Sequence, residues 1–286
     1  MKWMGRRESS NVDDRRGLSG GALAGGGGIA GVVIYLLYTF LSGGNVDTSE
    51  IARQVQQPGG GQALSAEQQA ADEQRAKFVK VVLADTEDVW NKLFTENGSQ
   101  YREPTLVLFR GAVESACGSA SSASGPFYCP GDNQLYIDLS FHEDMQNKLN
   151  APGDFAMAYV VAHEVGHHVQ NLMGTSEKMQ RMRGRVSETE YNKQSVKLEL
   201  QADFYAGVWA HHAQNMQNIL DAGDLDEALN AANAIGDDRL QKQATGQVIP
   251  DGFTHGTSAQ RMYWFKKGFE SGDLRQGDTF SDPSLN

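Results

Sequence analysis

Residues 163–167, which read His-Glu-Val-Gly-His, constrain the fold of this chain more than any other feature. They lie in a largely apolar stretch, 155–173, that ends at a glycine and is typical of a buried helix. On a helix, side chains four residues apart leave the same face, so His163 and His167 can approach one ion. Burying two imidazoles and the Glu164 carboxylate without a ligand would be costly. We therefore expect a metal site here and not a pair of exposed histidines.

The residue types at this spacing are typical of zinc, one ion per chain, with Glu164 beside the open coordination position. A catalytic zinc takes three protein ligands, and Glu199 is the predicted third, because it lies in a largely apolar helical stretch. Asp203 follows one turn later on the same face and would accept the free ring N–H of a ligand histidine. The rival third ligands are His211, His212 and His255.

This set of residues predicts hydrolysis. Zinc would activate a water molecule, and Glu164 would act as general base, taking the proton of the water and passing it to the leaving amine. His255 and Tyr263 are the candidate hydrogen-bond donors to the transition state, and a structural role is the alternative for each. His168 points about 100° away from His167, which favours a surface or supporting role over metal binding.

A second constraint comes from 24 consecutive residues without a charge, 18–41. At about 1.5 Å per residue such a helix can cross roughly 30 Å of hydrocarbon, so we expect one transmembrane helix over 18–42. A cleaved signal peptide with the apolar core 29–41 is the alternative, although no convincing small-x-small cleavage site follows. Glycines spaced four apart would let two such helices associate, and the alternative is that glycine is only tolerated there: Gly21, Gly25, Gly27 and Gly31.

The charges around this segment predict its orientation. Basic residues are concentrated before it: Lys2, Arg6, Arg7, Arg15 and Arg16. The positive-inside rule then keeps 1–17 in the cytoplasm and places 65–286 in the periplasm, as a single-pass protein of the inner membrane. The glycine-rich and polar residues 43–64 would form a flexible linker. Cys117 and Cys129 are expected to form a disulfide there, because a zinc ribbon would need a second cysteine pair.

Residues 65–286 are the expected folded domain, of the α+β class, mostly helical and with a small sheet. Ser65 and Gln68 have capping-box spacing and begin a helix that ends at Asn97. Strands are expected over 105–109 and 134–141, and further helices over 154–173, 191–214, 224–235 and 258–269. The net charge of −11 argues against nucleic acid as a partner, since binding phosphates needs clustered Lys and Arg.

The chain resembles the bacterial neutral zinc metallopeptidase family, a membrane-anchored group within the gluzincins. The likeness spans nearly the whole chain and rests on residues 6–17 (RRESSNVDDRRG), 127–132 (FYCPGD), 162–169 (AHEVGHHV), 198–203 (LELQAD) and 255–258 (HGTS). Gluzincins take their third ligand from an E-x-x-x-D helix, so the resemblance implies Glu199 as ligand with Asp203 beside it. It also implies endopeptidase activity on extracytoplasmic proteins or peptides, with an extended substrate paired along the strand 134–141.

Two other functions use the same zinc site. One is a zinc-stabilised, membrane-anchored binding or scaffold module without hydrolysis. The other is a zinc hydrolase of a non-peptide amide such as cell-wall material. Glu164 favours an enzyme over the scaffold, because a purely structural zinc site needs no general base.

Overall fold

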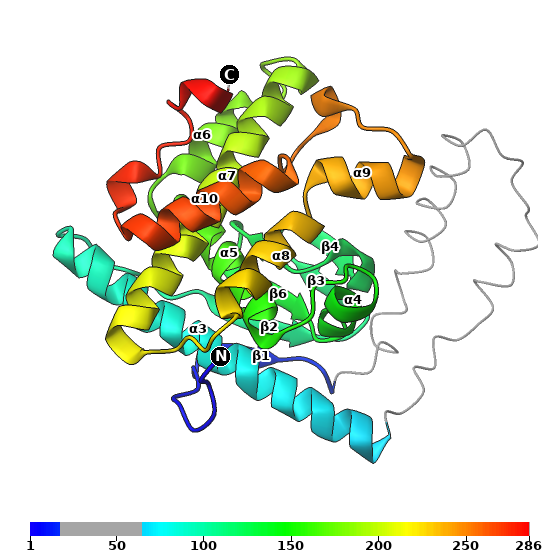
Figure 1. Cartoon of the computed structure of the whole chain (residues 1–286), viewed down its shortest axis with the longest axis vertical. Helices are drawn as coiled ribbons and strands as arrows, with labels where there is room; N and C mark the ends of the chain where they lie inside the picture. Colours follow the sequence, from blue (N-terminus) through cyan, green and yellow to red (C-terminus); the bar gives the residue numbers. More distant parts are fainter. Residues whose placement is uncertain (18–64, 286) are drawn as a thin grey trace, which may run out of the picture.

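The computed structural model describes residues 1–17 and 65–285, which form helices packed on a small sheet (Figure 1). The α-helices are α3 (Ala66–Glu96), α4 (Phe141–Asn147), α5 (Asp154–Leu172), α6 (Thr175–Met182), α7 (Glu188–Gln217), α8 (Asp224–Ala234), α9 (Asp237–Thr245) and α10 (Ser258–Ser271). The strands are β1 (Val12–Asp14), β2 (Thr105–Phe109), β3 (Ala112–Ser115), β4 (Gly118–Ser121), β5 (Phe127–Cys129) and β6 (Gln134–Asp138). Short 3₁₀ turns are η1 (Ser122–Ser124), η2 (Pro250–Gly252), η3 (Leu274–Gln276) and η4 (Pro283–Leu285). The predicted α+β, mostly helical class is confirmed.

The long first helix begins where the sequence predicts. The Gln68 N–H donates to Ser65 Oγ at 3.2 Å, and the Ser65 N–H donates to Gln68 Oε1 at 2.9 Å. This reciprocal pair satisfies two donors that the first helical turn would otherwise leave free. The four predicted helices further along the chain are also present, with ends that differ by no more than a few residues.

The sheet is larger than expected. Its strand order is β1-β2-β6-β5, in which β1, β2 and β6 run parallel and β5 runs antiparallel to β6. The strand predicted over 134–141 ends at Asp138, and its last residue enters α4. It is also an interior strand, so the expectation that it forms the edge beside a substrate is wrong. The edge strand beside β6 is β5, which has only three residues and is too short to show any alternation.

Strands β2 and β6 are buried on both faces, which is why they read as continuous apolar runs. One face packs into the main core with the helices, and it carries Leu106, Leu108, Leu135 and Ile137. The other face lies in a smaller cluster with Val113 of the β3–β4 hairpin, and it carries Val107, Phe109 and Tyr136.

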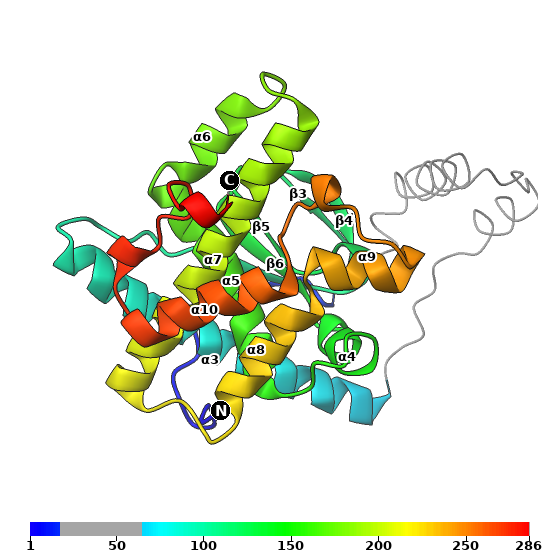
Figure 2. The ribbon, with the colours of Figure 1, turned by 45° about the horizontal axis from the view of Figure 1, so that its top comes forward.

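Close contacts between glycines and neighbouring backbones bring three helices together. Helix α5 packs against α3, α7 and α8, and α10 lies across α7 and α8 (Figure 2). A Cβ at Gly166 of α5 would lie 2.9 Å from the Ala202 carbonyl oxygen of α7. A Cβ at Gly207 of α7 would lie 2.0 Å from the backbone of α10, and one at Gly268 of α10 would lie 2.1 Å from the backbone of α7. Any larger residue would force these helices apart.

Residues 1–17 pack against the body formed by 65–285, with β1 added to the edge of β2. The charges around residues 18–41 predicted these two parts on opposite sides of a membrane, and that separation stays a prediction. The predicted membrane helix, 18–42, and the linker, 43–64, lie outside the described residues. Within 1–17 and 65–285, the structure contains no helix with the length and apolar character needed to cross a membrane.

Candidate metal centre

Helix α5 carries both histidines of the motif on one buried face. The His163 and His167 rings lie one turn apart with centroids separated by 4.8 Å. Their helix is almost wholly buried from Phe155 to Gln170, so the two rings sit in the interior and not on a solvated surface. The predicted pairing of the two rings is therefore present.

Helix α7 places Glu199 against both rings. Its Oε2 lies 3.1 Å from His163 Nε2 and 3.4 Å from His167 Nε2. Around a tetrahedral zinc with bonds of about 2.05 Å, neighbouring ligand atoms lie about 3.3 Å apart. These separations therefore fit a zinc ion bound by the two Nε2 atoms and one carboxylate oxygen.

Hydrogen bonds to the other ring nitrogens select the tautomer that such binding needs. The His163 Nδ1–H donates to Asp203 Oδ1 at 2.7 Å, and the His167 Nδ1–H donates to Gln170 Oε1 at 2.9 Å. Both Nε2 lone pairs are thereby directed toward Glu199, which is how metal-ligating histidines are usually held. Gln170 is held in turn, because its Nε2 donates to the Leu198 carbonyl at 2.7 Å.

The electrostatics of this cluster require a positive charge. An Nε2 lone pair and a carboxylate oxygen at 3.1 Å would repel each other unless a proton or a metal ion lay between them. Burial lowers the pKa of His163, but Asp203 and Glu199 outweigh burial and raise it to about 10. Burial raises the pKa of Glu199, but His167 and His163 outweigh it and lower the pKa well below its ordinary value. The same preference for positive charge would favour a bound cation.

Two residues that sequence analysis missed hold Asp203. The Tyr159 hydroxyl donates to Asp203 Oδ1 at 2.5 Å. Arg261 of α10 donates from Nε to Oδ2 at 2.8 Å and from Nη2 to Oδ1 at 3.0 Å. Burial opposes ionisation of Asp203, but Arg261 and His163 outweigh it and lower its pKa to about 2. Tyr159 lies one turn before His163 on the same helix face, a signal that was available in the sequence, whereas nothing local distinguishes Arg261.

A cleft of about 520 Å³ opens onto this cluster, within the range of sites that bind small ligands. Glu164 lies in its wall and is 8% exposed. Burial raises the pKa of its carboxyl group, while the two histidines oppose that shift. The cleft is otherwise lined mainly by apolar side chains, among them Phe127, Phe141, Val160, Met179, Leu198, Ile235 and Leu240.

The two predicted transition-state donors have different positions. His255 lies in the cleft wall, with Nδ1 at 2.9 Å from Thr254 Oγ1 and 3.3 Å from Asp237 Oδ1. The hydrogen bond to Asp237 raises the pKa of His255, against the effect of burial. Tyr263 is 57% exposed and does not line the cleft, because it lies two residues from Arg261 and so on the opposite side of α10.

The remaining histidines are held away from the metal cluster. His211 and His212 lie near the end of α7, where each contacts a backbone carbonyl oxygen, at 2.7 and 2.9 Å. His168 is buried, and its Nε2–H donates to the Arg102 carbonyl at 2.6 Å. Burial lowers its pKa to about 4 and keeps it neutral. Of the rival ligands, only His255 is near the cleft.

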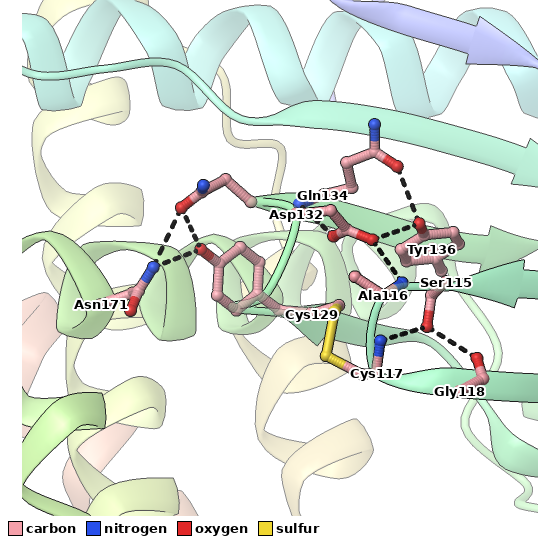
Figure 3. The surroundings of a disulfide bond; sticks show 11 residues. Ser115, Ala116, Cys117, Gly118, Cys129, Asp132, Gln134, Tyr136 and Asn171 are labelled. Atoms are coloured by element: carbon pink, nitrogen blue, oxygen red, sulfur yellow. Dashed lines mark hydrogen bonds between the residues drawn. A yellow bond between two sulfur atoms is a disulfide. The ribbon is translucent and has the colours of Figure 1, made fainter. Parts of the chain in front are cut away.

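His168 instead links α5 to the edge strand β5. Its Nδ1 lies 3.0 Å from the Tyr128 hydroxyl oxygen. Asn171 Nδ2 donates a hydrogen bond to the same hydroxyl oxygen at 3.0 Å. The predicted disulfide between Cys117 and Cys129 is confirmed, with 5.8 Å between the Cα atoms, and it joins β5 to the turn of the β3–β4 hairpin (Figure 3). The edge strand beside the cleft is thus held from two sides.

Comparisons with known proteins agree with this centre. A family model described as "Putative neutral zinc metallopeptidase" matches residues 1–280. The chain is 50% identical over 291 residues to "Uncharacterized protein YpfJ" of Escherichia coli K12, covering 98% of this chain and 99% of that protein. It is 43% identical over 195 residues to "Uncharacterized protein Rv2575" of Mycobacterium tuberculosis H37Rv, covering 65% of each. No solved structure matches it. The chain belongs to the neutral zinc metallopeptidase family.

Proposed function

We propose that this protein is a zinc-dependent endopeptidase, with His163, His167 and Glu199 as the metal ligands and Glu164 as general base. The observation that carries the proposal is the convergence of three donor atoms at zinc spacing, with both Nδ1 atoms already engaged by hydrogen bonds. Exposed acidic groups are common without a bound ion, whereas His163 is buried and His167 and Glu199 are half-buried.

The residues around the cleft supply the rest of the chemistry. A bound zinc would act as a Lewis acid on the scissile carbonyl and increase the acidity of water. Glu164 would take a proton from the attacking water and deliver it to the leaving amine. His255 would donate a hydrogen bond to the oxygen that becomes negative in the transition state, and its hydrogen bond to Asp237 raises its pKa and so favours the protonated form.

The edge strand β5 supports a peptide as substrate. Its β6-facing side is paired, and its other side is an edge of the described sheet. Gly125, Pro126, Phe127 and Tyr128 line the cleft, so an extended peptide could pair with this backbone while its side chains enter the apolar cleft. A non-peptide amide has no extended peptide backbone to pair along a strand, so the edge strand gives that alternative no support of this kind.

A purely structural zinc site is less consistent with the arrangement. Structural zinc is normally closed by four protein ligands, whereas three donors converge here among residues 1–17 and 65–285. The fourth side faces an open cleft with Glu164 in its wall. An open position and a general base are the features of a catalytic site.

The test uses the full-length protein, because residues 1–17 are packed on the body. Wild type, Glu164→Gln and Glu199→Ala are compared for bound zinc and for cleavage of a quenched-peptide library. We expect about one zinc per wild-type chain and cleavage, retained zinc without cleavage in Glu164→Gln, and lost zinc in Glu199→Ala. Equal inertness of zinc-loaded wild type and Glu164→Gln would favour the scaffold function, and absence of zinc from wild type would overturn the proposal.

The membrane anchor, self-association through its glycines and the periplasmic location remain predictions. The anchor and its self-association depend on residues 18–64, which lie outside the described part of the chain, whereas the location was predicted from the basic charges of residues 1–17.

A further inference from the structure

The first 17 residues are bound to the body by backbone pairing and by an aromatic contact. The Leu106 N–H donates to the Asn11 carbonyl at 2.9 Å, and the Arg15 N–H donates to the Leu108 carbonyl at 2.8 Å, so β1 continues the sheet. The Trp3 ring packs edge-on against Phe78 of α3 with 5.5 Å between centroids. These are the contacts of an integral strand and not of a solvated tail.

Basic side chains in this segment pair with acidic residues of α3. Arg6 contacts Asp85 at 2.6 Å, and Arg7 contacts Glu87 at 2.9 Å. The Asp85 and Glu87 side chains are only 4% and 3% exposed, whereas Arg6 is 19% and Arg7 51% exposed, so the Arg6–Asp85 pair is the one that is largely removed from water. Ser9 adds a hydrogen bond from Oγ to Glu87 Oε1 at 2.5 Å. In Figure 1 the N-terminal segment runs along α3 before it reaches β1.

The same basic residues are the ones that suggested a cytoplasmic tail. The positive-inside rule counts basic residues that stay in the cytoplasm, but it does not consider whether they have partners elsewhere in the chain. Contacts of about 3 Å cannot form across roughly 30 Å of hydrocarbon. The pairing of Arg6 and Arg7 with α3 therefore requires the tail and the body to be on one side of any membrane.

We propose that residues 1–17 and 65–285 fold as one unit within a single compartment. The acidic face of α3 and the edge of β2 form the docking surface, and the chain's own N-terminal segment is its occupant. This arrangement is independent of the proposed peptidase activity.

Cysteine accessibility tests the shared compartment in the full-length chain. Met4 is 82% exposed and Ile249 is 59% exposed, so Met4→Cys and Ile249→Cys should each be tolerated, and both native cysteines are paired. Each variant is treated with a membrane-impermeant maleimide in intact and in permeabilised cells. We expect the ratio of labelling in intact cells to labelling in permeabilised cells to be the same at both positions, whichever side of the membrane they share. Labelling of only one of them in intact cells would overturn the proposal.

Thermal unfolding of the purified full-length chain tests the docking itself. Arg6→Ala should lower Tm by about 3–10 °C, because it leaves the buried Asp85 carboxyl without its partner. Met4→Ala removes a side chain from the same segment that is exposed, so it is the matched control and should leave Tm unchanged. Adding Asp85→Asn to Arg6→Ala should recover part of the loss. Equal Tm values for Arg6→Ala and Met4→Ala would show that the segment is not docked.

Discussion

The substitution Gly166→Ala tests whether the close approach of α5 and α7 creates the metal site. The new Cβ would lie 2.9 Å from the Ala202 carbonyl oxygen and 3.1 Å from its Cα, whereas ordinary contacts begin at 3.4 Å. The two helices must therefore separate by about 0.5 Å at this level. Glu199 lies one turn before Ala202 on α7 and would move away from the histidines with it.

Zinc binding should be more sensitive to this movement than folding is. Metal–ligand distances tolerate about 0.2 Å, so we expect zinc affinity to fall by about 10- to 100-fold. Overpacking costs about 1–3 kcal/mol, and the better helix propensity of alanine offsets up to about 1 kcal/mol of that. The metal-free Gly166→Ala protein should therefore remain folded, with a modest decrease in Tm.

The assay is competition for zinc against a chromophoric chelator, with Tm measured on the metal-free protein. Gly252→Ala makes the same chemical change where the new Cβ would meet nothing closer than 3.7 Å, so it should bind zinc as wild type does. If Gly166→Ala binds zinc within about threefold of wild type, the glycine does not set the position of Glu199, and the reasoning from helix spacing fails.

Three further predictions concern the groups around the centre. Reduction of the Cys117–Cys129 disulfide should lower the free energy of unfolding by about 3 kcal/mol, because it frees a loop with a sequence separation of 12. The reduced protein should have a lower Tm, and a variant with both cysteines replaced by serine should show the same decrease without reductant. Asp237 raises the pKa of His255, and kcat/KM should fall as pH rises through that pKa because His255 loses its proton. Asp237→Asn should move this alkaline decrease in kcat/KM to lower pH. If the decrease does not move, His255 is excluded as the protonated donor. Arg261→Met should lower stability by about 3 kcal/mol in urea unfolding, more than Arg261→Lys does, since it removes the arginine partner of the buried Asp203 carboxylate.

Local sequence patterns predicted the parts of the fold that depend on neighbours along the chain. The capping pair Ser65 and Gln68 marked the start of α3, and the four-residue spacing of His163 and His167 placed both rings on one helix face. The apolar run 105–109 predicted β2 because a strand buried on both faces needs apolar side chains throughout. Helix periodicity also paired Glu199 with Asp203, and the structure brings both to the histidines.

Short strands and long-range partners could not be predicted in the same way. Strand β5 has three residues, too few for alternation to be recognised, and β1 consists of Val-Asp-Asp, which has little strand propensity. The tail was placed in the cytoplasm from its charge alone, although Arg6 and Arg7 pair with acidic residues of α3 that lie 79 and 80 positions further along the chain. Complementarity of this kind has no local signature.

The metal centre depends on contacts of this long-range type. The motif 163–167 supplies two ligands from one helix, but the third ligand arrives only because Gly166 allows α7 to approach α5. Gly207 and Gly268 in turn let α10 cross α7 closely, and that crossing delivers Arg261 to Asp203. The sequence motif thus identifies the metal ligands, while three glycines set how closely the helices that carry the ligands and Arg261 approach one another. Substituting Gly207 or Gly268 should therefore affect the centre more than the distance of either glycine from the ligands in sequence would suggest.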